Sequence, residues 1–141
     1  MQHRIIVIIC ILIFAVSATY AFYYRIGPAV DAGVYDQTAV NIIDCHGFRF
    51  NRSAPIAEDE IITFQGPLYQ YFLAGVYLIF GHNYEAVWLI QALLRAFTAL
   101  FIYLIAVKIF NEAGMRVGWI TADVFGLHPD IIEIGAMLMT E

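Results

Sequence analysis

Three long apolar stretches and one long polar interval divide the chain. The apolar stretches cover residues 5–24, 86–108 and 117–139, and the polar interval covers residues 25–66 within a longer connecting segment, residues 25–85. A helix rises about 1.5 Å per residue, so roughly 20 apolar residues cross a hydrocarbon core of about 30 Å. The pattern therefore predicts an all-α integral membrane protein with three transmembrane helices.

The first apolar stretch has a competing interpretation as a secretory signal peptide. Arg4 precedes the apolar core, and Val16-Ser17-Ala18 resembles a cleavage site. The stretch continues, however, into an aromatic cluster at the depth where interfacial rings prefer to lie, made of Tyr20, Phe22, Tyr23 and Tyr24. Its full length favours a membrane anchor.

Two segments between residues 25 and 85 have the character of surface helices. The first, at about residues 29–44, begins near Gly27-Pro28 and mixes apolar residues with carboxylates and amides. The second, at residues 67–80, is apolar but shorter than a comfortable membrane crossing. We expect both to lie on the membrane surface within the first outer loop.

The positive charges predict the orientation. With three crossings, Arg4, Lys108 and Arg116 all share the cytoplasmic side, as the positive-inside rule favours. A further crossing at residues 67–80 would move Lys108 and Arg116 outside and break the rule. The chain is therefore expected to be multi-pass in the cell membrane, with a cytoplasmic N-terminus and the long polar loop outside.

Composition agrees with a membrane protein and excludes one class of partner. The chain is 62% hydrophobic and 13% charged, whereas ordinary globular domains are about half apolar and about a quarter charged. The net charge of −5 and the scattered basic residues offer no surface for nucleic acid. Cys10 and Cys45 should lie at different depths, so we expect no disulfide between them.

Carboxylates in the outer loop are the main candidates for chemistry. Asp31 is the first carboxylate after the first apolar stretch. It is either an ordinary acidic residue in the first turn of a helix, which the helix dipole favours, or a general base in an outward-facing cavity. Asp36 is a rival for the second role. Glu141, which three crossings place on the same outer face, is a possible second acidic site that could bind a divalent metal.

Arg95 interrupts the apolar stretch 86–108 near its centre. A charge there costs at least about 2.5–3.5 kcal/mol on insertion scales, so it should face protein or water rather than lipid. Two interpretations stay open: pairing with Asp123 of the next apolar stretch, and a role in a substrate cavity.

Several short motifs occur in an order and spacing that resemble a known family. They are Asp31-(x)3-Tyr35-Asp36-(x)2-Ala39-(x)-Asn41, Gly47-Phe48, Gly66-Pro67-Leu68-Tyr69-(x)2-Phe72-Leu73-Ala74-Gly75, Phe80-Gly81, Ile90-Gln91-Ala92-Leu93-Leu94, Tyr103-Leu104-Ile105-Ala106, Ile109-Phe110, His128-Pro129 and Thr140-Glu141. Together they resemble the N-terminal part of the polyprenyl-phosphate-dependent glycosyltransferases of the type C membrane fold. The protein O-mannosyltransferases and lipid A aminoarabinose transferases of family 39 are the most similar members.

The resemblance implies an activity and a set of site residues. Such enzymes transfer a sugar from a polyprenyl-phosphate-linked donor to a lipid, glycan or protein acceptor at the outer membrane face. Asp31 matches their catalytic base or acceptor-orienting residue, and Glu141 matches a second acidic residue that binds metal or phosphate in some relatives. Four residues are weaker candidates for a cavity or donor contact: Tyr35, Gln65, Tyr69 and Arg95.

The chain departs from the family pattern in two ways. Relatives often carry a lysine and paired prolines where this chain has Gln65 and Gly66, so a lysine contact to the donor phosphate is not expected. Relatives also have many more transmembrane helices. We therefore expect residues 1–141 to be the N-terminal part of a larger multi-pass membrane domain, whose activity need not survive in the isolated piece.

Two other functions remain open from the residues alone. One is a non-enzymatic small membrane subunit. The other, ranked last, is a transporter or channel in which Arg95, Asp123 and Glu133 line a polar path. Further apolar spans encoded downstream would favour the enzyme, and substrate flux in liposomes would favour the transporter.

Overall fold

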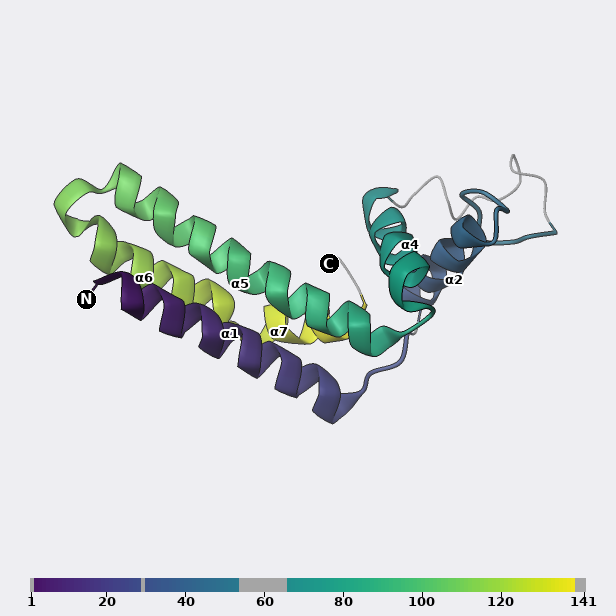
Figure 1. Cartoon of the computed structure of the whole chain (residues 1–141), viewed down its shortest axis with the longest axis horizontal. Helices are drawn as coiled ribbons and strands as arrows, with labels where there is room; N and C mark the ends of the chain where they lie inside the picture. The colour runs from purple at the N-terminus through teal and green to yellow at the C-terminus, as the bar shows by residue number, and fades with distance from the viewer. Residues whose placement is uncertain (1, 29, 54–65, 139–141) are drawn as a thin grey trace. The chain divides into compact units, whose positions relative to one another are not determined.

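The computed structural model describes residues 2–28, 30–53 and 66–138 (Figure 1). In this part of the chain all regular structure is helical, which confirms the prediction of an all-α protein. The elements are α1 (Gln2–Tyr24), α2 (Asp31–Ile43), α4 (Leu68–Phe80), α5 (Tyr84–Ile109), the short 3-10 turn η2 (Asn111–Ala113), α6 (Gly114–Gly126) and α7 (Pro129–Ala136).

Two of the described helices are long and apolar enough to cross a membrane. They are Arg4–Tyr24 of α1 and Tyr84–Ile109, which is the whole of α5. The described residues thus contain two clear candidate spans, where the sequence pattern predicts three.

The predicted third crossing, residues 117–139, is not one continuous helix. The 13-residue helix α6 ends at Gly126, and the 8-residue helix α7 begins at Pro129. Proline has no backbone N–H and disfavours helical geometry in the residue before it, so the helix is interrupted there. Each piece alone is too short to cross a bilayer.

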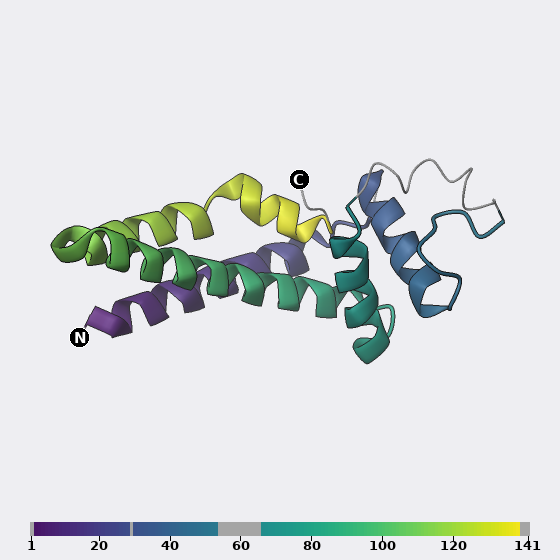
Figure 2. The same ribbon diagram turned by 90° about the horizontal axis from the view of Figure 1, so that it is seen from above.

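The first compact unit joins Met1–Ile26 to Trp88–Ala136. Within it α1, α5 and α6 run alongside one another in both views (Figures 1 and 2), and α1 also packs against α7. Its core is built by buried side chains from three helices: Ile6, Ile9, Ile13, Ala99, Tyr103 and Ala122. Around this core, many large apolar side chains of α1 and α5 remain exposed, as expected of surfaces that face lipid.

One face of α6 consists of small residues at every fourth position. These buried residues are Gly114, Gly118, Ala122 and Gly126. A Cβ atom on Gly114 would lie 2.7 Å from the Cα of Val107, so the backbones of α5 and α6 approach directly after the turn η2. Such small-residue stripes are a common device of helix packing in membranes, where van der Waals contact replaces the hydrophobic effect.

The second compact unit contains Gly27–Val87 together with the described residues Met137 and Leu138. Here α2 packs against α4. The buried contacts include two alanines of α2, Ala32 and Ala39, and Leu73 of α4. The last turn of α4 exposes an apolar end, since Leu78 and Ile79 are 77% and 73% exposed. That exposed end is compatible with the expected surface helix, which stays a prediction.

Candidate functional site

Asp31 is the first residue of α2 and is exposed to solvent. Val30 before it adopts a positive φ of 51°, so the chain turns sharply as it enters the helix. Within the described residues, no hydrogen bond engages the Asp31 carboxylate. The side chain is exposed, and the N-terminus of the helix favours a negative charge there.

Two of the aromatic candidates from the sequence meet near this end of α2. Tyr35 follows Asp31 by four residues and therefore shares its helix face. The ring of Tyr35 packs edge-on against Tyr69 of α4, with ring centroids 5.3 Å apart and an interplanar angle of 83°. Tyr69 in turn stacks with Phe72 at 5.8 Å. A carboxylate and a short aromatic ladder are thus contributed by two packed helices.

Asp36, the rival candidate, is surrounded by hydrogen-bonding side chains. Its Oδ1 accepts a hydrogen bond of 2.6 Å from the hydroxyl of Tyr77 and lies 2.8 Å from Nε2 of His82. Its Oδ2 accepts a hydrogen bond of 3.0 Å from the hydroxyl of Tyr84. The side chain is only 15% exposed. With both oxygens engaged, Asp36 is better suited to anchoring α2 than to accepting a substrate proton.

The partners of Asp36 come from three consecutive parts of the chain. Tyr77 lies in the last turn of α4, His82 in the connection, and Tyr84 at the first residue of α5. Burial and then the hydrogen bond to Asp36 raise the pKa of Tyr77, so its phenol stays protonated and donates. The sequence gives no local signal for this cluster, because Asp36 and its partners are separated by 41 to 48 residues.

Asn41 organises the loop that follows α2. It is fully buried, and its Nδ2 donates to the backbone carbonyls of Arg49 at 2.7 Å and Phe50 at 2.9 Å. Its Oδ1 accepts a hydrogen bond of 2.6 Å from Nε of Arg52. Arg52 also pairs with Asp44 at 2.6 Å. The buried amide thus holds the loop against α2, a role that the motif alone does not reveal.

Arg95 of α5 is 9% exposed and joins three helices of the first unit. Its Nη1 donates to Oγ of Ser17 in α1 at 2.8 Å, and its Nη2 donates to the backbone carbonyl of Ile131 in α7. Of the two interpretations of Arg95, the pairing with Asp123 is therefore wrong, and the substrate-cavity role stays untested. Gly135, one turn after Ile131 in α7, leaves the space that the guanidinium occupies.

Two of the predicted site residues, Gln65 and Glu141, lie outside the described residues. Among the residues that are described, no group of three or more histidine, cysteine, aspartate or glutamate side chains is close enough to hold a metal ion. The candidate site in the described residues therefore consists of Asp31, the packed rings of Tyr35 and Tyr69 next to it, and the hydrogen-bonded carboxylate of Asp36.

The described residues thus combine two candidate membrane spans with an exposed carboxylate shortly after the first of them, which is typical of the class of helical membrane proteins with a candidate site beside a span. Residues 65–136, more than half of the chain, match the family model of the dolichyl-phosphate-mannose-protein mannosyltransferases. The chain belongs to this family of glycosyltransferases, which confirms the resemblance seen in the sequence.

The matched range includes Tyr69, Arg95 and the helices α4 to α7. Asp31, Tyr35 and Asp36 precede it, so the match does not assign their roles. No curated protein and no solved structure matches the chain.

Proposed function

We propose that the protein transfers a sugar from a polyprenyl-phosphate-linked donor to a lipid, glycan or protein acceptor at the outer membrane face. The membership in the mannosyltransferase family supports glycosyl transfer as the class of reaction. The exposed carboxylate of Asp31, at the start of the first helix after the membrane anchor, supplies a residue suited to the chemistry.

The donor lipid constrains where the reaction occurs. Its prenyl chain stays in the bilayer, so the bond between phosphate and sugar lies near the headgroups. The catalytic base must reach the acceptor hydroxyl within hydrogen-bond distance. The candidate span of α1 ends at Tyr24, and Asp31 follows after only six intervening residues. This short connection supports a base held close to the interface.

In the proposed reaction, Asp31 takes the proton of the acceptor hydroxyl as that oxygen attacks the anomeric carbon of the sugar. A new glycosidic bond forms while the bond between the anomeric carbon and the phosphate oxygen breaks. The polyprenyl phosphate leaves with the bonding electron pair. The aromatic ladder of Tyr35 and Tyr69 supplies flat apolar surface beside the base, suited to contact the donor or acceptor.

The proposed topology keeps three crossings, with α6 and α7 together forming the third. Residues 114–136 match the 23 residues of α1 in number, and both α6 and α7 pack against α1. Exposed Cys45 in the outer loop is a natural reporter of this topology. In a Cys10→Ser background, a membrane-impermeant maleimide added to intact cells should label Cys45. Labelling only after the membrane is opened would overturn the proposed orientation.

The activity is tested on the protein expressed from its natural reading frame. Membranes that contain it are supplied with synthetic polyprenyl-phosphate sugars, and sugar transfer is measured. We expect Asp31→Asn to lower transfer by about 100-fold or more, as for loss of a general base. The control is Asp44→Asn, which removes an exposed carboxylate at the other end of α2 and leaves Asp31 intact.

Three results would count against the proposal in different ways. No transfer from a panel of polyprenyl-phosphate hexoses and pentoses by the unchanged protein would reject the donor class. Full turnover by the correctly inserted Asp31→Asn variant would reject Asp31 as the base. An equal loss in both variants would indicate a general effect of charge on α2.

A further inference from the structure

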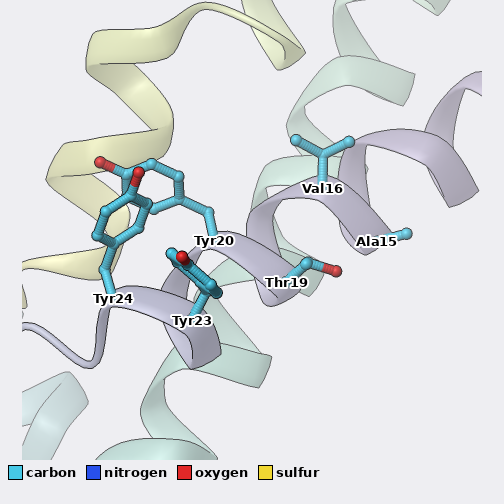
Figure 3. A pocket seen from close by; sticks show the side chains of 6 residues that line it. All are labelled: Ala15, Val16, Thr19, Tyr20, Tyr23 and Tyr24. Atoms are coloured by element: carbon cyan, nitrogen blue, oxygen red, sulfur yellow. The ribbon is translucent and has the colours of Figure 1, made fainter.

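A shallow groove of about 410 Å³ runs along the C-terminal end of α1 (Figure 3). It is lined by Ala15, Val16, Thr19, Tyr20, Tyr23 and Tyr24. Since α1 is a candidate membrane span that ends at Tyr24, the tyrosines mark the mouth of the groove at the level of the headgroups. The small and apolar residues continue the groove toward the bilayer centre.

The three tyrosine rings form one cluster. The ring centroids of Tyr20 and Tyr24 lie 4.4 Å apart, and those of Tyr23 and Tyr24 lie 5.0 Å apart with an interplanar angle of 82°. Tyr23 and Tyr24 are 78% and 56% exposed, so their rings are accessible to a ligand. Figure 3 shows the ring of Tyr24 beside that of Tyr20, with Thr19 and Val16 following along the helix.

The charges at this groove favour a cation. No lysine or arginine lines it. Glu133 lies on α7, which packs against α1, so its carboxylate adds negative charge beside the helix that carries the groove. Aromatic ring faces also carry negative potential, and clustered rings bind quaternary ammonium groups well. A ligand with an ammonium group fits this end of the groove better than an anion does.

The polarity of the groove changes along its length, so the ligand should be amphipathic. The floor at Ala15 and Val16 suits an acyl chain, and the mouth combines ring faces with phenol hydroxyls that can donate to phosphate or ester oxygens. We propose that this groove is a binding site for a phospholipid with an ammonium headgroup, such as phosphatidylcholine. The inference concerns lipid binding and stands independently of sugar transfer.

The test measures lipid association by electron spin resonance on the protein reconstituted in bilayers. Spin-labelled phosphatidylcholine is compared with spin-labelled phosphatidylglycerol, which has no ammonium group. The unchanged protein should retain the phosphatidylcholine preferentially. Tyr24→Leu should lower that association by about 3- to 10-fold, the range of one or two cation–π contacts.

Two more variants separate the site from general effects. Glu133→Gln keeps the rings and removes the charge, so it should reduce the preference for phosphatidylcholine over phosphatidylglycerol even if Tyr24→Leu inserts poorly. Phe110→Leu is the control. It removes an exposed aromatic ring directly after the C-terminal end of α5, which is not part of the groove, so it should change neither the association of phosphatidylcholine nor the preference for it.

Equal association of the two lipids with the unchanged protein would overturn the proposal. That result would instead fit a groove that receives a lysine or arginine side chain of a protein partner, or rings that serve only as an interfacial belt. A preference that survives both Tyr24→Leu and Glu133→Gln would also overturn it, because the selective site would then lie elsewhere.

Discussion

The hydroxyl of Tyr77 donates a 2.6 Å hydrogen bond to Oδ1 of Asp36, joining residues 41 positions apart in the chain. This contact ties the last turn of α4 to the middle of α2. His82 and Tyr84 bring the beginning of α5 to the same carboxylate. Because α2 also carries Asp31, we expect the Asp36 cluster to help hold the helix that presents the candidate base.

Replacing Asp36 by asparagine should destabilise the second unit. The amide nitrogen of asparagine cannot accept hydrogen bonds, so one phenol donor in a largely buried site would lose its acceptor. We expect a loss of about 1–3 kcal/mol. Thermal unfolding in detergent, with hydrogen exchange of α2 as a local probe, measures it. Asp44→Asn is the control, since its pair with Arg52 is about 40% exposed and should contribute little. Equal effects of the two substitutions would contradict the anchoring role.

The pKa of Tyr77 gives the sign of a pH effect. Because folding raises this pKa above its ordinary value of 10.0, the stabilisation is fully present below that value and is lost as pH rises through the folded pKa. We therefore expect the difference in unfolding temperature between the unchanged protein and Tyr77→Phe to stay constant from about pH 7.5 to 9. A difference that falls steadily over this interval would indicate that the phenol already ionises there.

Two glycine-to-alanine substitutions should change stability in opposite directions. A Cβ on Gly114 would lie 2.7 Å and 2.8 Å from backbone atoms of Val107, so α5 and α6 would have to separate. Gly75, inside α4, has no neighbouring atom within 4 Å of the same position. Gly114→Ala should therefore destabilise by about 1–3 kcal/mol, whereas Gly75→Ala should stabilise by about 0.5–1 kcal/mol through helix propensity. Thermal unfolding of both variants under one condition checks the contrast, and a stabilising Gly114→Ala would disprove the close packing.

Hydrophobic length predicted the all-α architecture and the two long spans well, because a membrane crossing requires a continuous apolar run. The same criterion did not predict that the helix is interrupted within residues 117–139. There the apolar content is sufficient, but Pro129 interrupts the helix. The proline itself is a local signal for such a break, because it cannot donate the backbone hydrogen bond of a continuous helix.

Contacts between residues that are far apart in the chain could not be predicted from the sequence either. The buried position of Arg95 follows from the cost of placing a charge in lipid, but its acceptors could not be predicted. They are a serine of α1 and a backbone carbonyl of α7, and neither carries a charge that would mark it as a partner. Likewise, no pattern linked Asp36 to His82, since the interaction exists only once α2 and α4 have packed.

Gly135 and Arg95 should show strong coupling in a double-mutant cycle. A Cβ on Gly135 would overlap the guanidinium, which would have to leave Ser17 and the carbonyl of Ile131. Hydrogen bonds of a buried charged group contribute about 1.5–3 kcal/mol, so Gly135→Ala should destabilise by a similar amount.

In an Arg95→Met background the obstruction is gone, and the added methyl group should then cost nothing measurable. Unfolding temperatures of the two single variants and the double variant give the coupling energy directly. Additive losses would show that the guanidinium does not fill the space beside Gly135.

Sugar transfer measured on the same variants tells whether Arg95 has a structural role or contacts substrate in a cavity. If Arg95 only joins α1, α5 and α7, activity should fall in proportion to the folded fraction. If it contacts substrate, Arg95→Met should abolish transfer in protein that remains fully folded.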